Sequence, residues 1–182
     1  MLIETDVTVA APPEELYRLM LDIERVIPCM PGAELVGRDN GTYTVKLGVK
    51  LGPMSLSYSG TVAIAEQDDA ARRAVMRAEA AEQRNQGNVR ATMSMAVAEE
   101  AEQHSRLHVS SDVLVTGRVA QMGRGIMQDV ATKMLSDMAA CLEKTLSQSA
   151  PAGEPQAQPT QLSALSLLRS VVSARVRRVV RR

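Results

Sequence analysis

Apolar and polar residues alternate over residues 2–9, a pattern that predicts a β-strand. An Ala-Ala-Pro-Pro sequence ends this strand. Because proline is typical of the first helical position, we expect a helix at 13–21. A further helical turn at 22–27 runs into a loop at 28–32, which contains two prolines and a glycine. The chain therefore begins with one strand and two short helices.

The alternation then returns and predicts six more strands, which form an antiparallel meander. Asp39-Asn40-Gly41 is typical of a tight hairpin turn between the first two of them. Residues 71–84 are ambiguous, because their Ala, Glu and Arg favour a helix while their apolar positions alternate. The neighbouring strands lead us to predict a strand there. The six strands are expected at 33–38, 43–51, 55–64, 71–84, 89–97 and 107–115.

After Gly117 the apolar period changes from 2 to 3.6, which predicts one helix at about 119–148. At about 1.5 Å per residue this helix is roughly 45 Å long, and only a curved sheet could bury one face of it. We therefore predict an α+β fold for residues 1–148, a curved antiparallel sheet around a long C-terminal helix. The apolar stripe of this helix contains Met122, Ile126, Met127, Val130, Met134, Leu135, Met138, Cys141 and Leu142.

The last part of the chain differs in composition from the rest. Residues 149–160 are mostly Pro, Gln and Ala, which predicts a disordered linker. Residues 161–182 resume the helical period, with an apolar sector about 120° wide. They hold six arginines and no acid, whereas the preceding chain has 15 basic and 21 acidic residues. A membrane-surface helix explains both the apolar sector and the cations. A protein-docking helix would need only the sector, and nucleic-acid binding would leave the sector unexplained.

The apolar residues are unusual in kind. The chain has no Phe and no Trp, only three Tyr, and 11 Met. Small side chains leave volume unfilled, and Met adapts its shape either to irregular gaps in a core or to a bound ligand. Composition alone leaves both interpretations of the Met residues open.

Residues for catalysis or metal binding are sparse. Cys29 and Cys141 are too few for a disulfide framework and lack metal-ligand spacing, and Cys29 is either a packed thiol or a reactive one in a loop. His104 and His108 are about 13 Å apart on a strand and cannot share a metal ion. The start does not resemble a signal peptide, and no stretch approaches the about 18 apolar residues of a spanning helix. We expect a cytoplasmic protein that is not an enzyme and has no covalent cofactor.

Four motifs, taken in order, resemble one family. They are 11–17 (Ala-Pro-Pro-Glu-Glu-Leu-Tyr), 29–32 (Cys-Met-Pro-Gly), 49–53 (Val-Lys-Leu-Gly-Pro) followed by Gly60, and 115–123 (Val-Thr-Gly-Arg-Val-Ala-Gln-Met-Gly). Over about residues 1–148 the chain is similar to the CoxG family, which accompanies aerobic molybdenum carbon monoxide dehydrogenase and belongs to the START-like SRPBCC superfamily.

The resemblance implies a helix-grip fold and an accessory protein of carbon monoxide dehydrogenase that takes part in its membrane attachment. It also implies a superfamily habit of binding apolar ligands, although the superfamily includes hydrolases and cyclases. The chain departs from the family pattern where Tyr17 replaces a usual Trp, and where Met138, Ala139 and Leu142 replace usual Phe residues. We expect these smaller side chains to enlarge or soften a cavity.

Together these expectations predict a membrane-tethered carrier. It would take an apolar ligand such as a respiratory quinone (menaquinone or ubiquinone) between the membrane and carbon monoxide dehydrogenase. The alternative is a membrane anchor or assembly factor for the same enzyme, without a carrier role. The expected partners are the carbon monoxide dehydrogenase subunits, a hydrophobic small molecule and the anionic inner face of the cell membrane, but not nucleic acid.

The expected site residues form two sets. Those expected to line the ligand cavity are Tyr17, Tyr58, Met76, Met93, Met95, Val113, Met122, Ile126, Met127, Val130 and Met134. Those expected to bind the membrane are Leu165, Leu168, Arg169, Val172, Arg175, Val176, Arg177, Arg178, Val179, Arg181 and Arg182.

Overall fold

The computed structural model describes residues 1–51, 54–84 and 87–149. The expected linker 149–160 and the basic tail 161–182 lie outside these residues, apart from Ser149, and stay predictions. Among the described helices, none is both long enough and apolar enough to cross a bilayer.

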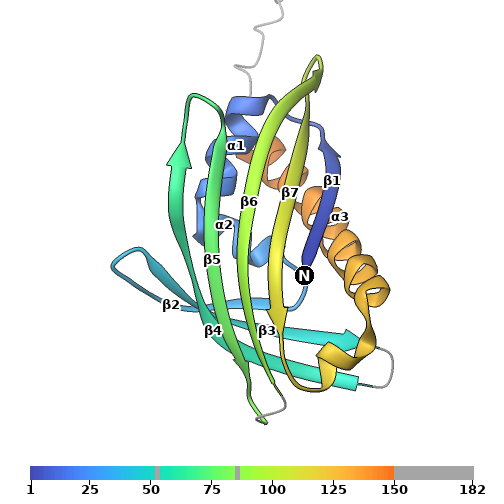
Figure 1. Ribbon diagram of the computed structural model, residues 1–182. Helices are drawn as coiled ribbons and strands as arrows, with labels where there is room; N and C mark the ends of the chain where they lie inside the picture. Colours follow the sequence, from blue (N-terminus) through green and yellow to red (C-terminus); the bar gives the residue numbers. More distant parts are fainter. Residues whose placement is uncertain (52–53, 85–86, 150–182) are drawn as a thin grey trace, which may run out of the picture. The chain divides into compact units, whose positions relative to one another are not determined.

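Seven antiparallel strands form one sheet, in the order β1-β7-β6-β5-β4-β3-β2. Figure 1 shows the sheet curving around the helices, which lie behind the strands in this view. The predicted helix-grip fold is confirmed. Its elements are β1 (Leu2–Val9), α1 (Pro13–Leu21), α2 (Ile23–Val26), the 3₁₀ helix η1 (Ile27–Cys29), β2 (Ala33–Asp39), β3 (Thr42–Leu51), β4 (Met54–Asp68), β5 (Arg73–Glu82), β6 (Asn88–Ala101), β7 (His104–Val115), the 3₁₀ helix η2 (Arg118–Met122) and α3 (Arg124–Ser149).

The ambiguous segment 71–84 is a strand, as predicted. β5 pairs with β4 on one side and with β6 on the other, so both of its edges are hydrogen-bonded. These two ladders outweigh the weak helical preference of its Ala and Glu residues, which is well under 1 kcal/mol per residue.

The C-terminal helix does not begin at 119. Residues 118–122 form η2, and Gly123 then adopts a positive φ of 81° before α3 begins at Arg124. Glycine populates this region without a steric penalty, and it interrupts the helical path there. Beyond this break, the Arg124 guanidinium and the Gln128 amide donate hydrogen bonds to the carbonyl oxygens of Leu2 and Glu4, and α3 thus covers the β1 edge of the sheet.

β4 is the strand through which the sheet bends most visibly in Figure 1. Gly60 lies near its middle, and a Cβ atom at this position would be 2.0 Å from the carbonyl oxygen of Glu79 on β5. The two backbones approach this closely only because residue 60 has no side chain. A register shift between Ile64 and Glu66 adds a second irregularity to the same strand.

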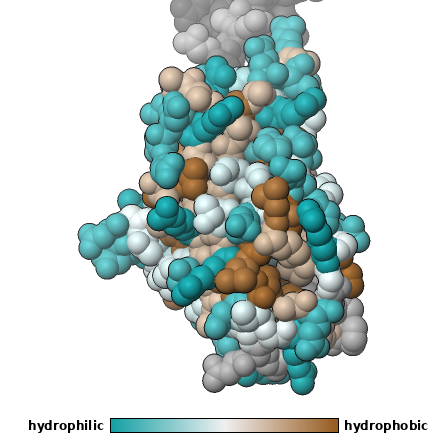
Figure 2. Space-filling view, viewed as in Figure 1, coloured by the Kyte–Doolittle hydropathy of each residue, from teal (hydrophilic) through white to brown (hydrophobic). Residues whose placement is uncertain are grey.

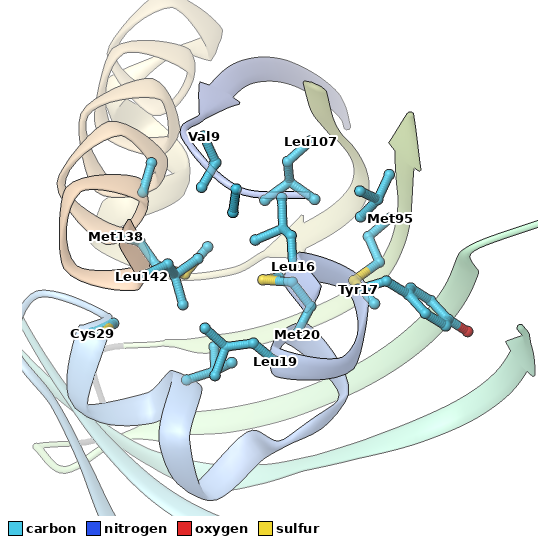
Figure 3. Packing of buried hydrophobic residues seen from close by; sticks show 14 of the residues in the cluster. Val9, Leu16, Tyr17, Leu19, Met20, Cys29, Met95, Leu107, Met138 and Leu142 are labelled. Carbon is cyan, nitrogen blue, oxygen red and sulfur yellow. The ribbon is translucent and has the colours of Figure 1, made fainter. Parts of the chain in front are cut away.

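The main core fills one end of the molecule. Leu16 and Leu19 of α1 pack against Leu142 of α3 and against Met95 and Leu107 of the sheet (Figure 3), and all five are almost fully buried. The outer face of the sheet is mostly hydrophilic, with hydrophobic atoms gathered over its lower part (Figure 2). The core thus occupies the side of the sheet that faces the helices.

A disulfide joins Cys29 of η1 to Cys141 of α3, with 5.3 Å between their Cα atoms. The expectation that Cys29 is a free thiol, packed or reactive, is therefore wrong. The partners are 112 residues apart in sequence, and only the packing of η1 against α3 brings them together.

Candidate functional site

An apolar cavity of about 280 Å³ lies between α3 and the half of the sheet away from the main core. Its volume is close to the lower end of the range for ligand pockets, about 300–1,000 Å³. Its walls come from η1 and β2, from all strands between β3 and β7, and from η2 and α3. Apart from Lys46, Thr61 and Glu79, the residues that line it are Ile27, Met30, Ala33, Val45, Leu47, Val49, Leu56, Tyr58, Val62, Ala78, Ala80, Val89, Ala91, Met93, Val113, Val115, Val119, Met127, Val130 and Met134.

Strand alternation makes this wall apolar. On β3, Val45, Leu47 and Val49 share the inward face, while Lys46 contributes only from a position that faces the other side. Thr61 and Glu79 likewise sit at outward positions of β4 and β5. A ligand in the cavity would therefore meet hydrocarbon and thioether groups almost everywhere.

The space itself results from small and adaptable side chains. Ala78 and Ala80 on β5 and Ala91 on β6 fill little of the volume above the sheet. Four methionines also line this volume, at 30, 93, 127 and 134. Their thioether chains adjust to irregular shapes, so the cavity can adapt its volume to an apolar occupant.

α3 has different neighbours along its length. Leu135, Met138 and Leu142 belong to the main core, whereas Met127 and Val130 face the cavity. Met138, Ala139 and Leu142 are buried in that core, so the small residues at these positions do not enlarge the cavity, contrary to our expectation. They pack there with buried residues of α1.

The structure brings together six of the 11 residues expected to line a cavity. Tyr58, Met93, Val113, Met127, Val130 and Met134 all lie in its wall. That they contact a ligand stays a prediction.

The other five residues lie elsewhere. Met95 is fully buried in the main core, and Met76 packs at the border of two core clusters. Ile126 precedes the cavity-lining Met127 on α3, but it is 44% exposed and does not line the cavity. Met122 belongs to η2, and its side chain lies outside what the structure describes. Tyr17 belongs to the main core.

Sequence reasoning missed the lining residues between the start of η1 and the start of β2, which are Ile27, Met30 and Ala33. The two prolines and the glycine of 28–32 indicate a loop, and a loop pattern does not show which side chains turn inward. Sequence reasoning also missed Leu47 and Val49, although the alternation on β3 is clear, because a strand's period does not tell which face turns inward.

Tyr17 makes a separate polar contact at the end of the main core. Its hydroxyl donates to the Asp69 carboxylate at 2.9 Å and to the Arg73 carbonyl oxygen at 3.2 Å, and Figure 3 shows it pointing away from the apolar cluster. Burial, together with the hydrogen bond to Asp69, raises the pKa of Tyr17 to about 12. Hydrogen bonds from Gln67 and Tyr17 lower the pKa of Asp69.

The Tyr17 contact predicts a pH dependence of stability. The folded state favours the neutral phenol, so its contribution is fully present below the unfolded pKa of 10.0 and is lost as the pH rises towards about 12. Titration of tyrosinate absorbance should show a step near pH 12 whose amplitude Tyr17→Phe lowers by one tyrosine. Tyr17→Phe should also raise the pKa of Asp69, which carboxylate NMR would detect. An unchanged amplitude of the step near pH 12 in Tyr17→Phe would contradict this assignment.

A family model that describes the CoxG subunit of carbon monoxide dehydrogenase matches residues 6–147. The matched range covers nearly all of the described elements and every residue that lines the cavity. A search of curated proteins finds no matching sequence.

Solved structures share the fold at low sequence identity. A conserved protein from Geobacillus kaustophilus matches with a TM-score of 0.72 and 16% identity, over 82% of this chain and 97% of that chain. A START superfamily protein from Mycobacterium smegmatis has a TM-score of 0.53 and 18% identity, over 81% and 97%. The Zhui aromatase/cyclase from Streptomyces sp. R1128 has a TM-score of 0.57 and 14% identity, over 85% and 98%. These likenesses show a START-like fold, which occurs in enzymes as well.

Proposed function

The chain belongs to the CoxG family of carbon monoxide dehydrogenase, and from this membership and the apolar cavity we propose that it carries a respiratory quinone between the membrane and carbon monoxide dehydrogenase. The cavity is the observation that carries this proposal. A bound apolar chain would remove both its own surface and the cavity wall from water, which stabilises the complex by about 25 cal/mol per Å² of apolar surface.

The chemistry of the wall supports binding rather than catalysis. Among the described lining residues, the inward-facing side chains are apolar apart from the hydroxyl of Tyr58. General acid–base catalysis needs a group that exchanges protons near the working pH. Burial, followed by the nearby Glu82 carboxylate, raises the pKa of Tyr58 and takes its phenol further from that condition.

The membrane half of the proposal rests on the sequence of residues 161–182. Their apolar sector and six arginines fit the surface of an anionic bilayer. We propose that this tail keeps the carrier on the inner face of the cell membrane, where a quinone resides, and that the folded domain meets the enzyme there.

The test is to identify what the protein carries. We expect native mass spectrometry of the full chain, purified from its own host without detergent, to show a bound quinone that solvent extraction releases. Purified protein that carries no quinone or other apolar molecule would overturn the carrier role. The anchor or assembly factor would then explain the family membership better.

A variant of the cavity wall makes the same test sharper. Met127→Trp places an indole in the space that the ligand needs, and accommodating both would cost about 1–3 kcal/mol of overpacking. We expect quinone occupancy to fall by roughly tenfold or more, since about 1.4 kcal/mol corresponds to a factor of ten. Circular dichroism and the melting temperature should stay close to those of the wild type.

Ile126→Trp is the matched control for this variant. It adds the same ring to the same helix, at an exposed position outside the cavity wall. Its quinone occupancy should equal that of the wild type. A similar loss in both variants would mean that the ligand does not occupy this cavity.

A further inference from the structure

Tyr58 is the one lining residue that brings an inward-facing polar group to the cavity within the described part of the chain. Its side chain is nine-tenths buried, with 6% of the residue exposed, and packs with Leu56 and Val119. Within residues 1–51, 54–84 and 87–149, its hydroxyl has no hydrogen-bond partner. Among the described residues no fully buried side-chain oxygen lacks a partner, so the Tyr58 oxygen keeps some accessible surface, at which an acceptor from outside the protein can reach it.

Tyr17 shows what the same side chain does where the protein itself supplies partners. Its hydroxyl bonds both the Asp69 carboxylate and the Arg73 carbonyl oxygen. Tyr17 and Tyr58 are both buried, but of the two only Tyr58 lies in the wall of the cavity between α3 and the sheet. The Tyr58 hydroxyl is therefore a hydrogen-bond donor without a partner among the described residues, in the wall of an otherwise apolar cavity.

The surroundings of Tyr58 keep this donor neutral. Desolvation of the ring by burial, and then the charge of Glu82, raise its pKa above the ordinary value of 10.0. At neutral pH the phenol therefore carries its proton and can donate it in a hydrogen bond.

Glu82 also affects which acceptor can lie beside Tyr58. The two residues are direct neighbours across the β4–β5 ladder, and Glu82 is only 3% exposed. Its carboxylate accepts a hydrogen bond from the backbone N–H of Arg84 at 2.6 Å. An anionic ligand head would have to approach this carboxylate in a medium of low dielectric constant, where repulsion is stronger than in water.

We propose that Tyr58 donates a hydrogen bond to a neutral carbonyl oxygen of the ligand, so that the cavity selects apolar molecules with a neutral acceptor head over fatty acids. The inference rests on the proposed carrier function and deepens it. A quinone has this chemistry, because its carbonyl oxygens accept hydrogen bonds and carry no charge. The rest of the wall would bury the ring and the first part of the chain.

The test compares three probes that carry an apolar chain of similar length: a decyl-substituted benzoquinone, decylbenzene, which has no acceptor, and the fatty acid decanoate. Equilibrium dialysis with the full-length protein measures the affinity of each. We expect the wild type to bind the quinone more tightly than decanoate. Tyr58→Phe should weaken quinone binding by roughly tenfold, because the carbonyl is then buried without a donor, and should leave decylbenzene binding unchanged.

Tyr17→Phe is the control, since it removes an equivalent hydroxyl that is not in the cavity, and it should change neither affinity. If Tyr58→Phe leaves quinone affinity unchanged, or weakens quinone and decylbenzene equally, the donor role of Tyr58 is wrong while the carrier role stands. Equal or tighter binding of decanoate by the wild type would overturn the selection of neutral heads. If the wild type binds none of the three probes, both this inference and the proposed function fail.

Discussion

The double variant Cys29→Ser/Cys141→Ser is expected to be much less stable than the oxidised wild type. The disulfide closes a loop of 112 residues, and chain-entropy arguments give about 4.7 kcal/mol for a loop of about 100 residues. For a domain of this size the loss corresponds to a decrease of roughly 10–20 °C in melting temperature. Thermal unfolding followed by circular dichroism measures it.

A reductant provides the matched control. The reduced wild type should melt close to the double variant, because both lack the cross-link but keep the same packing of η1 against α3. Identical melting of the oxidised wild type, the reduced wild type and the double variant would show that the two cysteines are not cross-linked.

Replacing the six arginines of residues 161–182 by Gln is expected to abolish most binding to anionic vesicles. Each cation near an anionic surface contributes about 1 kcal/mol, so six contribute at most about 6 kcal/mol, and less as salt screens them. Binding to neutral vesicles should change little, because it depends on the apolar sector. Vesicle co-sedimentation with anionic and with neutral lipids, at two salt concentrations, measures both.

Replacing the same six arginines by Lys is the control for this variant, since it keeps the charge and should keep the affinity for anionic vesicles. Deletion of 161–182 should release the protein from both kinds of vesicle without unfolding residues 1–148. If the Arg→Gln variant and the wild type bind anionic and neutral vesicles equally well, the tail does not bind the membrane through charge. A protein-docking tail, and with it the anchoring alternative, would then be favoured.

Most of the architecture could be predicted from the sequence, because each element shows its period locally. The alternation in 71–84, together with the neighbouring strands, predicted β5 against a helical composition, and the 3.6 period after Gly117 predicted α3. Asn40 and Gly41 form the expected hairpin turn, both with positive φ. These features depend on residues within a few positions of each other, and a single sequence records them.

The positions of the candidate site residues could not be predicted in this way, because they depend on contacts between segments that are distant in the sequence. The sequence identified Tyr17 and Tyr58 as equivalent candidates, yet the fold places one at Asp69 and the other in the cavity wall. Nothing in the sequence indicates that Cys29 and Cys141 meet, since only the packing of η1 on α3 brings their Cα atoms within 5.3 Å. A long helix after Gly117 was predictable, but where it leaves the core and faces the cavity depends on α1, which packs against only one end of it.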